Sequence, residues 1–223
     1  MRSIGAGICI GLGGLCYLSV SDNTLGALLF SIGLLSVLIF QFHLYTGWVC
    51  YSFRYKRPIS LLGVLIGNFL GAMIIGLMTR YNPELLDTIW NICGDKLDKS
   101  WPSWFVASIF CGAFIAIAVI SWGFTRNFPS YFTVILSIMG FILTGSEHVV
   151  ADMYYFSAGL ILDNIEVWYR LLVCAIGNMI GGFIVGQLIL DSWLQTAVES
   201  RIQQQLLDKL IKAAESNKVE EEN

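Results

Sequence analysis

Six runs of predominantly apolar residues, each about 20 residues or longer, limit the possible folds of this chain more than any other feature. They cover roughly residues 3–20, 25–53, 59–80, 103–124, 131–156 and 167–190. A helix of this length crosses the hydrocarbon core of a bilayer, and it satisfies its backbone polar groups internally. Only 13% of the residues are charged, about half the usual share in soluble domains. The sequence therefore predicts an all-α integral membrane protein with six transmembrane helices.

Basic residues in two of the loops predict the orientation of these helices, because Lys and Arg concentrate on the cytoplasmic side. The residues concerned are Arg54, Lys56, Arg57 and Arg126. With six spans, both termini are expected in the cytoplasm, and the protein is expected in the plasma or inner membrane. Arg80 and Arg170 fall on the opposite side and weaken this argument. We expect a transmembrane domain over 1–190 and a cytoplasmic amphipathic helix and tail over 191–223.

An internal repeat is visible in the third and sixth apolar runs. The third contains IGNFLGAMIIG and the sixth contains IGNMIGGFIVG. Glycines at four-residue spacing let helices approach closely. Because each half then has three spans, the two halves are expected to be inverted copies in the membrane. The repeats would cover about 1–80 and about 101–190.

The second and fifth runs each contain polar residues and a glycine deep in apolar sequence, in FQFHLYTG and LTGSEHVV. A charged side chain at the bilayer centre costs about 3 kcal/mol or more, so it usually marks a functional site. The two histidines of the chain, His43 and His148, lie in these two stretches. Both spans are therefore predicted to be interrupted helices, whose new N-termini present N–H groups to anions.

No cofactor, metal or nucleic-acid partner is expected from the remaining residues. The six cysteines form no C-x-x-C pair and are interpreted as helix-packing residues. A metal held by His43, His148 and Glu147 would block a path through the interrupted helices. No basic block indicates nucleic-acid binding.

The chain resembles the formate/nitrite transporter family over roughly residues 5–190. The residues that carry the resemblance are SEHVVADMYY, LYTG and the two Gly-Asn helices. The resemblance implies an aquaporin-like protomer of two inverted three-helix repeats, with helices two and five interrupted. It also implies a homo-pentamer in the lipid bilayer, in which each protomer has its own pore, and no enzymatic activity.

The resemblance also implies a set of pore residues. Carried over by position, His148 is the pore histidine, Glu147 the acid before it, and Thr46 the threonine that faces the histidine. The loop of helix two supplies Leu44 and Tyr45, the apolar constrictions are Phe30, Leu34 and Phe141, and Lys99 lies near the outer mouth. Structural interpretations stay open: Glu147 could fix a neighbouring backbone segment, and Lys99 could be an ordinary loop lysine.

The predicted substrates are small monovalent weak-acid anions, namely formate, nitrite or hydrosulfide. A bare anion in an apolar neck would pay a large desolvation cost, whereas the neutral acid would pay far less. A histidine exchanges protons near neutral pH. The anion is therefore expected to gain a proton, directly or through His148 and water, although His148 could instead only hydrogen-bond the anion.

Four departures from the family pattern concern the size and polarity of the pore. Ser146 replaces an aromatic residue, Asp152 replaces Asn, His43 replaces an acid and Phe114 replaces Asn. Two other functions remain open. An aquaporin-like channel for neutral solutes would need Asn-Pro-Ala motifs, which the sequence lacks. An intramembrane enzyme would need a dyad such as Ser146 with His148.

Overall fold

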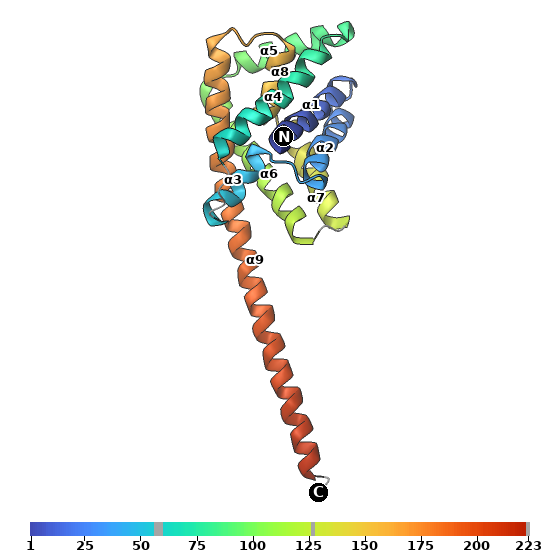
Figure 1. Ribbon diagram of the computed structural model, residues 1–223, viewed down its shortest axis with the longest axis vertical. Coiled ribbons are helices and arrows are strands. Elements are labelled where there is room, and N and C mark those ends of the chain that lie inside the picture. Colours follow the sequence, from blue (N-terminus) through green and yellow to red (C-terminus); the bar gives the residue numbers. More distant parts are fainter. Residues whose placement is uncertain (56–59, 126–127, 222–223) are drawn as a thin grey trace. The chain divides into compact units, whose positions relative to one another are not determined.

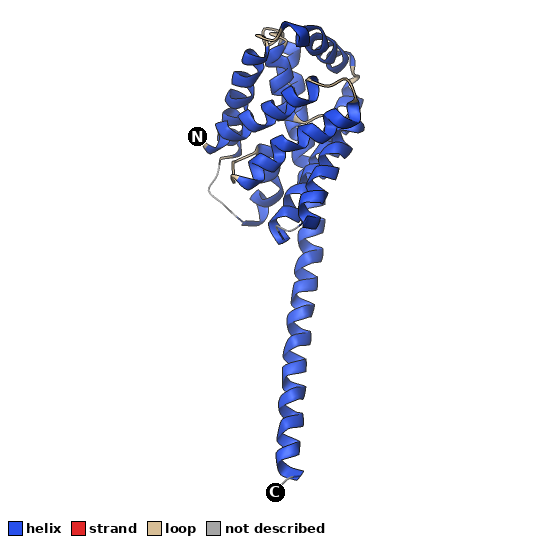
Figure 2. Ribbon diagram, turned by 90° about the vertical axis from the view of Figure 1, so that its right-hand side faces the viewer, coloured by secondary structure: helices blue, strands red, loops and turns tan. Residues whose placement is uncertain are grey.

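The computed structural model describes the backbone of residues 1–55, 60–125 and 128–221, and helices are the regular secondary structure of these ranges (Figure 2). The helices, labelled in Figure 1, are α1 (Arg2–Leu18), α2 (Asn23–Ile39), α3 (Tyr45–Tyr55), α4 (Leu61–Thr79), the 3-10 turn η1 (Pro83–Leu85), α5 (Leu86–Asp98), α6 (Trp101–Thr125), α7 (Phe128–Leu143), α8 (Val149–Ala158) and α9 (Ile165–Glu221). The basic side chains used to predict the orientation, Arg54, Lys56, Arg57 and Arg126, lie outside the described residues.

Three helical stretches are long and apolar enough to cross a membrane, namely Leu61–Thr79, Trp101–Phe124 and Ile165–Thr196. Shorter apolar helices cover Arg2–Leu18, Asn23–Ile39 and Pro129–Leu143. They are shorter partly because the apolar runs at 25–53 and 131–156 are each divided into two helices. The breaks lie between α2 and α3 and between α7 and α8, within the two polar stretches noted in the sequence.

Both breaks begin with the same turn at the end of the preceding helix. After α2, Gln41 has a φ of 54°, and the N–H of Phe42 donates to the carbonyl of Val37 at 2.9 Å. After α7, Gly145 has a φ of 64°, and the N–H of Ser146 donates to the carbonyl of Phe141 at 2.9 Å. This is the Schellman arrangement, which satisfies carbonyls that a helix end leaves unpaired. Both helices therefore end without exposing these backbone groups.

Close helix contacts explain the glycines of the two repeated motifs. A Cβ atom on Gly71 of α4 would lie 2.1 Å from the carbonyl oxygen of Ile4 in α1. A Cβ atom on Gly181 of α9 would lie 1.9 Å from the carbonyl oxygen of Ile109 in α6. Any side chain would force these pairs apart, so backbone meets backbone there, as between small residues in membrane helices. Figure 1 shows α1 beside α4, against which it packs closely.

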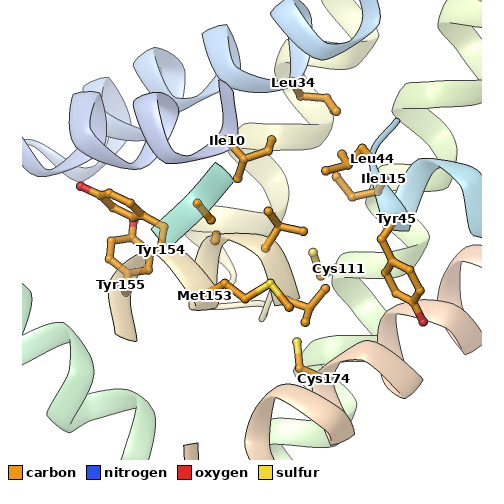
Figure 3. Packing of buried hydrophobic residues seen from close by; sticks show 14 of the residues in the cluster. Ile10, Leu34, Leu44, Tyr45, Cys111, Ile115, Met153, Tyr154, Tyr155 and Cys174 are labelled. Carbon is orange, nitrogen blue, oxygen red and sulfur yellow. The ribbon is translucent and has the colours of Figure 1, made fainter. Parts of the chain in front are cut away.

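The described chain divides into two compact units, Met1–Gly186 and Gln187–Asn223. Within the first unit, α1 packs against α2, α4 and α8, and α7 packs against α2 and α6. Figure 3 shows part of its apolar core, in which Leu34, Leu44 and Ile115 lie close together. The two helix breaks lie inside this unit, and of their polar side chains Thr46, Ser146, Glu147 and His148 are buried, whereas Gln41 and Thr144 at the preceding helix ends are exposed. This is the setting in which non-helical backbone is tolerated at membrane depth.

Candidate functional site

Two asparagines from the Gly-Asn motifs hold the two breaks. The side chain of Asn68 in α4 accepts from the N–H of Tyr45 at 2.8 Å, and it donates to the carbonyls of His43 and Ser3. The N–H of Tyr45 is the first of α3, the carbonyl of His43 lies just before this helix, and the carbonyl of Ser3 belongs to α1. Because an amide can make several hydrogen bonds, one side chain satisfies two backbone groups at the helix break and also connects them to α1.

Asn178 in α9 makes the matching bonds at the second break. It accepts from the N–H of Val149 at 3.0 Å, and it donates to the carbonyls of Glu147 and Ser108 at 2.8 and 2.7 Å. Both asparagines are fully buried. Their bonds place Leu44 and His148 at equivalent positions, each directly before the first residue of the helix that follows the break.

His148 is the N-cap of α8, and its ring geometry determines its protonation state. The ring nitrogen Nδ1 accepts from the N–H of Ala151 at 3.2 Å. The other nitrogen, Nε2, lies 3.0 Å from the hydroxyl oxygen of Thr46. Because a backbone N–H can only donate, Nδ1 must carry a lone pair, and the ring proton of the neutral histidine lies on Nε2. His148 therefore donates to Thr46, whose own hydroxyl proton remains available to another acceptor.

A cavity of about 200 Å³ lies against this histidine. Six of the predicted pore residues line it, namely Phe30, Lys99, Phe141, Ser146, Glu147 and His148. The remaining lining comes mostly from α5 and α8. Thr46 does not line the cavity, but it contacts His148 from the opposite break.

Two phenylalanines narrow the cavity near His148. The rings of Phe30 and Phe141 meet edge to face with centroids 5.9 Å apart. The ring of Phe141 also stacks on the imidazole of His148 at 5.9 Å. The cavity is thus charged at one side and aromatic beside the histidine. This arrangement opposes passage of a charged ion more than passage of its neutral acid.

Five charged side chains line the cavity, namely Asp95, Lys96, Lys99, Glu147 and Asp152, and the last four form one cluster of ion pairs. Lys96 contacts both Glu147 and Asp152, the latter at 2.7 Å, and Lys99 contacts Glu147 at 2.6 Å. Lys99 also donates to the carbonyl of Gly145 at 2.9 Å. The two lysines neutralise the two carboxylates. The lysines differ in access to solvent, because the side chain of Lys99 is 27% exposed and that of Lys96 only 15%.

Lys96 keeps its charge in this buried position. Burial alone would lower the pKa of the ammonium group, but the carboxylates of Asp152 and Glu147 outweigh it and hold the pKa well above its ordinary value. Lys96 also lies near the rings of Trp104 and Tyr155, 5.7 and 5.5 Å from their centroids. A permanent positive charge therefore lies at one wall of the cavity, supplied by α5, a helix outside the apolar runs.

Besides Thr46, four predicted pore residues lie away from the cavity lining: Leu34, His43, Leu44 and Tyr45. Leu34 and Leu44 belong to the apolar core (Figure 3). The hydroxyl of Tyr45 donates to the carbonyl of Ala175 in α9. The half-buried ring of His43 meets Trp48 edge to face, with centroids 5.1 Å apart.

Ser146, which replaces an aromatic residue of the family pattern, pairs with a neighbouring hydroxyl. Its Oγ lies 2.9 Å from Oγ1 of Thr144. Both nitrogens of His148 are already bonded to Thr46 and Ala151. The dyad that an enzyme would need between Ser146 and His148 is therefore not formed. Phe114, another departure, packs against Gly140, where its ring would lie 2.9 Å from an added Cβ atom.

Sequence reasoning missed several residues of this site. Lys96 did not figure among the predicted site residues, and Asp152 figured only as a departure from the family pattern, without its partner Lys96. The two asparagines were recognised only as parts of glycine-rich packing motifs. A signal for Lys96 did exist, because α5 presents Ile92, Cys93 and Lys96 at helical spacing, shortly before Lys99. The missing information was which surface this short helix covers.

The buried asparagine pair, the two helix breaks and the cavity with lysines at its mouth define a helical membrane channel or transporter. The sequence profile described as "Formate/nitrite transporter" matches residues 1–191, and the chain belongs to this family. Its members are transporters and channels, not enzymes.

Two curated relatives and one solved structure illustrate this similarity. The chain is 25% identical over 200 residues to the formate channel FocA of Haemophilus influenzae, covering 77% of this chain and 70% of that protein. It is 26% identical over 180 residues to formate-nitrite transporter 2 of Toxoplasma gondii, covering 70% of this chain but only 38% of the relative's length. The fold matches a pentameric formate channel with formate bound, with a TM-score of 0.68 and 20% identity, over 89% of this chain and 95% of that one.

Proposed function

We propose that this protein conducts small monovalent weak-acid anions, namely formate, nitrite or hydrosulfide, across the membrane. The single observation that carries the proposal is the cavity that leads from Lys99 to a neutral histidine at a helix break. Six spans, arranged as two inverted repeats, are part of the proposal. The matching bonds of Asn68 and Asn178 support the repeats, because an inverted copy would reproduce the same contacts.

The lysines would attract the anion into the cavity. Lys99 is the more exposed of the two and already bonds a carboxylate and a carbonyl oxygen. An entering carboxylate or nitrite would compete for the same ammonium group. The paired acids, Glu147 and Asp152, would balance the charges of the two lysines, so that the anion is attracted without being held too tightly to leave.

The anion would then cross the aromatic neck as its neutral acid. Passage between Phe30 and Phe141 removes water, and an unpaired charge there would cost several kcal/mol or more. His148 would supply a hydrogen-bond donor at this point, through Nε2 or through the hydroxyl of Thr46. The proton would come from water in the cavity. His148 could donate one only as an imidazolium, which would take Nδ1 from the N–H of Ala151.

Uptake into proteoliposomes would test this function, with formate, nitrite, hydrosulfide, lactate, glycerol and urea at pH 5–8. We expect at least one anion to cross faster at acidic pH, where more of it is neutral. His148→Asn should reduce uptake by about tenfold or more, while Asn keeps the N-cap of α8. His43→Asn is the matched control, because His43 lies away from the cavity. If only glycerol or urea crosses, the anion assignment is wrong.

A homo-pentamer and cytoplasmic termini are also proposed. The pentamer is proposed because the solved channel of similar fold is described as pentameric. Native mass spectrometry of the detergent-solubilised protein would give the number of subunits. A protease site at the C-terminus, tested in right-side-out vesicles from cells, would show which side of the plasma or inner membrane carries residues 191–223.

A further inference from the structure

Arg170 is a buried arginine whose position was unexplained by the sequence. It lies near the start of α9 and is 2% exposed. Its guanidinium group donates to the carbonyls of Leu97 and Lys99, the latter at 2.9 Å. Nε also donates to the carboxylate of Glu166 at 2.9 Å. Arg170 thus connects α9 with the C-terminal end of α5, the helix that carries Lys96 and directly precedes Lys99.

The two carbonyls lie where a helix leaves its acceptors unpaired. The helix α5 ends at Asp98, and Lys99 continues in an extended conformation with φ −63° and ψ 130°. The last carbonyls of a helix need a donor from outside, and a cation there also interacts favourably with the helix dipole. A guanidinium group fits this position, since its planar fork reaches two acceptors at once. Arg170 therefore caps α5 from a different helix.

This cap determines the course of the backbone that carries both lysines. The carbonyl that Arg170 binds on Lys99 belongs to the residue whose ammonium group reaches Glu147. Lys96 lies about one turn earlier on the same helix. A second connection runs through Trp104, because the guanidinium of Arg170 lies 5.2 Å and the ammonium of Lys96 5.7 Å from its ring centroid. The indole N–H of Trp104 also donates to the carbonyl of Arg170.

We propose that Arg170 is a positioning residue for anion capture, which acts by fixing the end of α5 so that Lys99 and Lys96 face the cavity. The inference rests on the function proposed above. It does not require Arg170 to touch the anion, because the guanidinium is fully engaged with α5, Glu166 and two tryptophans. Without the cap, the end of α5 would move away, and Lys99 would be presented to the cavity for a smaller fraction of the time.

Concentration-dependent formate uptake by the full-length protein in proteoliposomes tests this inference. Arg170→Gln should raise the half-saturating formate concentration about tenfold, with a smaller change in the maximal rate, because capture is weakened and the neck is intact. Glu166→Gln is the matched control. It removes the ion pair on the exposed side but keeps both carbonyl bonds, so the half-saturating concentration should stay within about twofold.

A double-mutant comparison separates positioning from general damage. In a Lys99→Met background, Arg170→Gln should have a clearly smaller effect on formate capture than in the wild type, since one of the two lysines through which it acts is absent. Equal effects in both backgrounds would overturn the inference. If Arg170→Gln does not yield folded protein, Arg170→Lys should give an intermediate effect, because an ammonium group keeps the charge but lacks the fork.

A second readout does not depend on transport. An amine-reactive reagent, followed by mass spectrometry, measures how fast Lys99 is modified. We expect Lys99 to react several-fold faster in Arg170→Gln than in the wild type or Glu166→Gln, because its contacts with Glu147 and Gly145 would be made less often. Unchanged Lys99 reactivity would overturn the inference. Failure of the wild type to transport any anion would instead contradict the proposed function.

Discussion

The two helix breaks have the same backbone construction but different chemistry. Each begins with a left-handed residue, Gln41 or Gly145, and each is held by an asparagine that bonds the first N–H of the next helix. In this common register several pairs differ chemically, among them His43 with Glu147, Leu44 with His148, and Trp48 with Asp152. At these three positions the first break has an imidazole, an aliphatic chain and an indole, where the second has a carboxylate, an imidazole and a carboxylate.

This difference shows that the backbone of a break does not require charged side chains, and that the carboxylates are specific to the second break. The carboxylates of the second break face Lys96 and Lys99 of α5, whereas His43 faces the ring of Trp48. A buried carboxylate is tolerated only beside a compensating charge. The acids are therefore placed where α5 supplies two lysines. The following predictions test which features are shared and which are specific to the second break.

Loss of either asparagine should have the largest effect on stability. Asn178→Leu would leave the N–H of Val149 and the carbonyls of Glu147 and Ser108 without their side-chain partner. Unsatisfied buried groups cost about 1–3 kcal/mol each, so we expect loss of most folded protein. Asn68→Leu should have a similar effect if the breaks are equivalent. Thermal unfolding in detergent, followed by tryptophan fluorescence, would measure both, and a tolerated substitution at one site alone would refute the equivalence.

Glu147→Gln should have the next largest effect, this time on transport. The substitution removes one charge from two buried ion pairs and leaves Lys96 and Lys99 with one carboxylate between them. Breaking a buried pair costs about 3–5 kcal/mol, so we expect reduced stability and formate uptake lowered about tenfold or more. Asp152→Asn is the comparison, because Asn can still accept from Lys96 and Glu147 keeps both lysines. A larger loss in Asp152→Asn would reverse the roles assigned to the two acids.

The breaks were predictable from sequence because polar residues and glycine interrupt long apolar runs. The position of His148 follows from the same pattern, whereas Phe30 and Phe141 were predicted only from the family resemblance; all three line the cavity. Residues whose role depends on a distant partner were harder to predict. The sequence marks Asn68 and Asn178 as unusual, but it does not say which backbone groups they satisfy.

The charge cluster shows the same limit. Lys96 contributes because α5 folds back over α8, and neither the length nor the charge of the loop predicts that contact. Arg170 counted in the sequence only as a positive residue on the unexpected side. Its cap on α5 gives it a structural reason for that position, independent of topology. Sequence patterns therefore did not predict these contacts between segments that lie far apart in the chain.

Thr46→Val should have an intermediate effect, specific to the contact between the two breaks. Thr46 is buried, and its hydroxyl is the partner of Nε2 of His148. Valine keeps the shape but leaves the ring N–H without an acceptor, at a cost of about 1–3 kcal/mol. We expect formate uptake to fall several-fold, while Thr46→Ser stays close to the wild type. Equal uptake by both variants would show that the neck does not use this hydroxyl.

Substitution of the left-handed residue at each break by its counterpart from the other break should give the smallest changes in the free energy of unfolding, and the two changes should have opposite signs. Gln41 adopts φ 54° with a side chain that costs about 1–2 kcal/mol there, whereas Gly145 adopts φ 64° without that cost. Gln41→Gly should therefore stabilise the protein by about 0.5–1 kcal/mol, after the larger entropy of glycine in the unfolded chain is subtracted. Gly145→Gln should destabilise the protein by a similar amount, because the new side chain brings the same backbone cost. It adds no steric clash, since the atom nearest to the new Cβ is Nζ of Lys99 at 4.0 Å. Unfolding curves of both variants would measure the difference. Changes of the same sign would mean that the two turns, despite their matching hydrogen bonds, do not carry the same backbone strain.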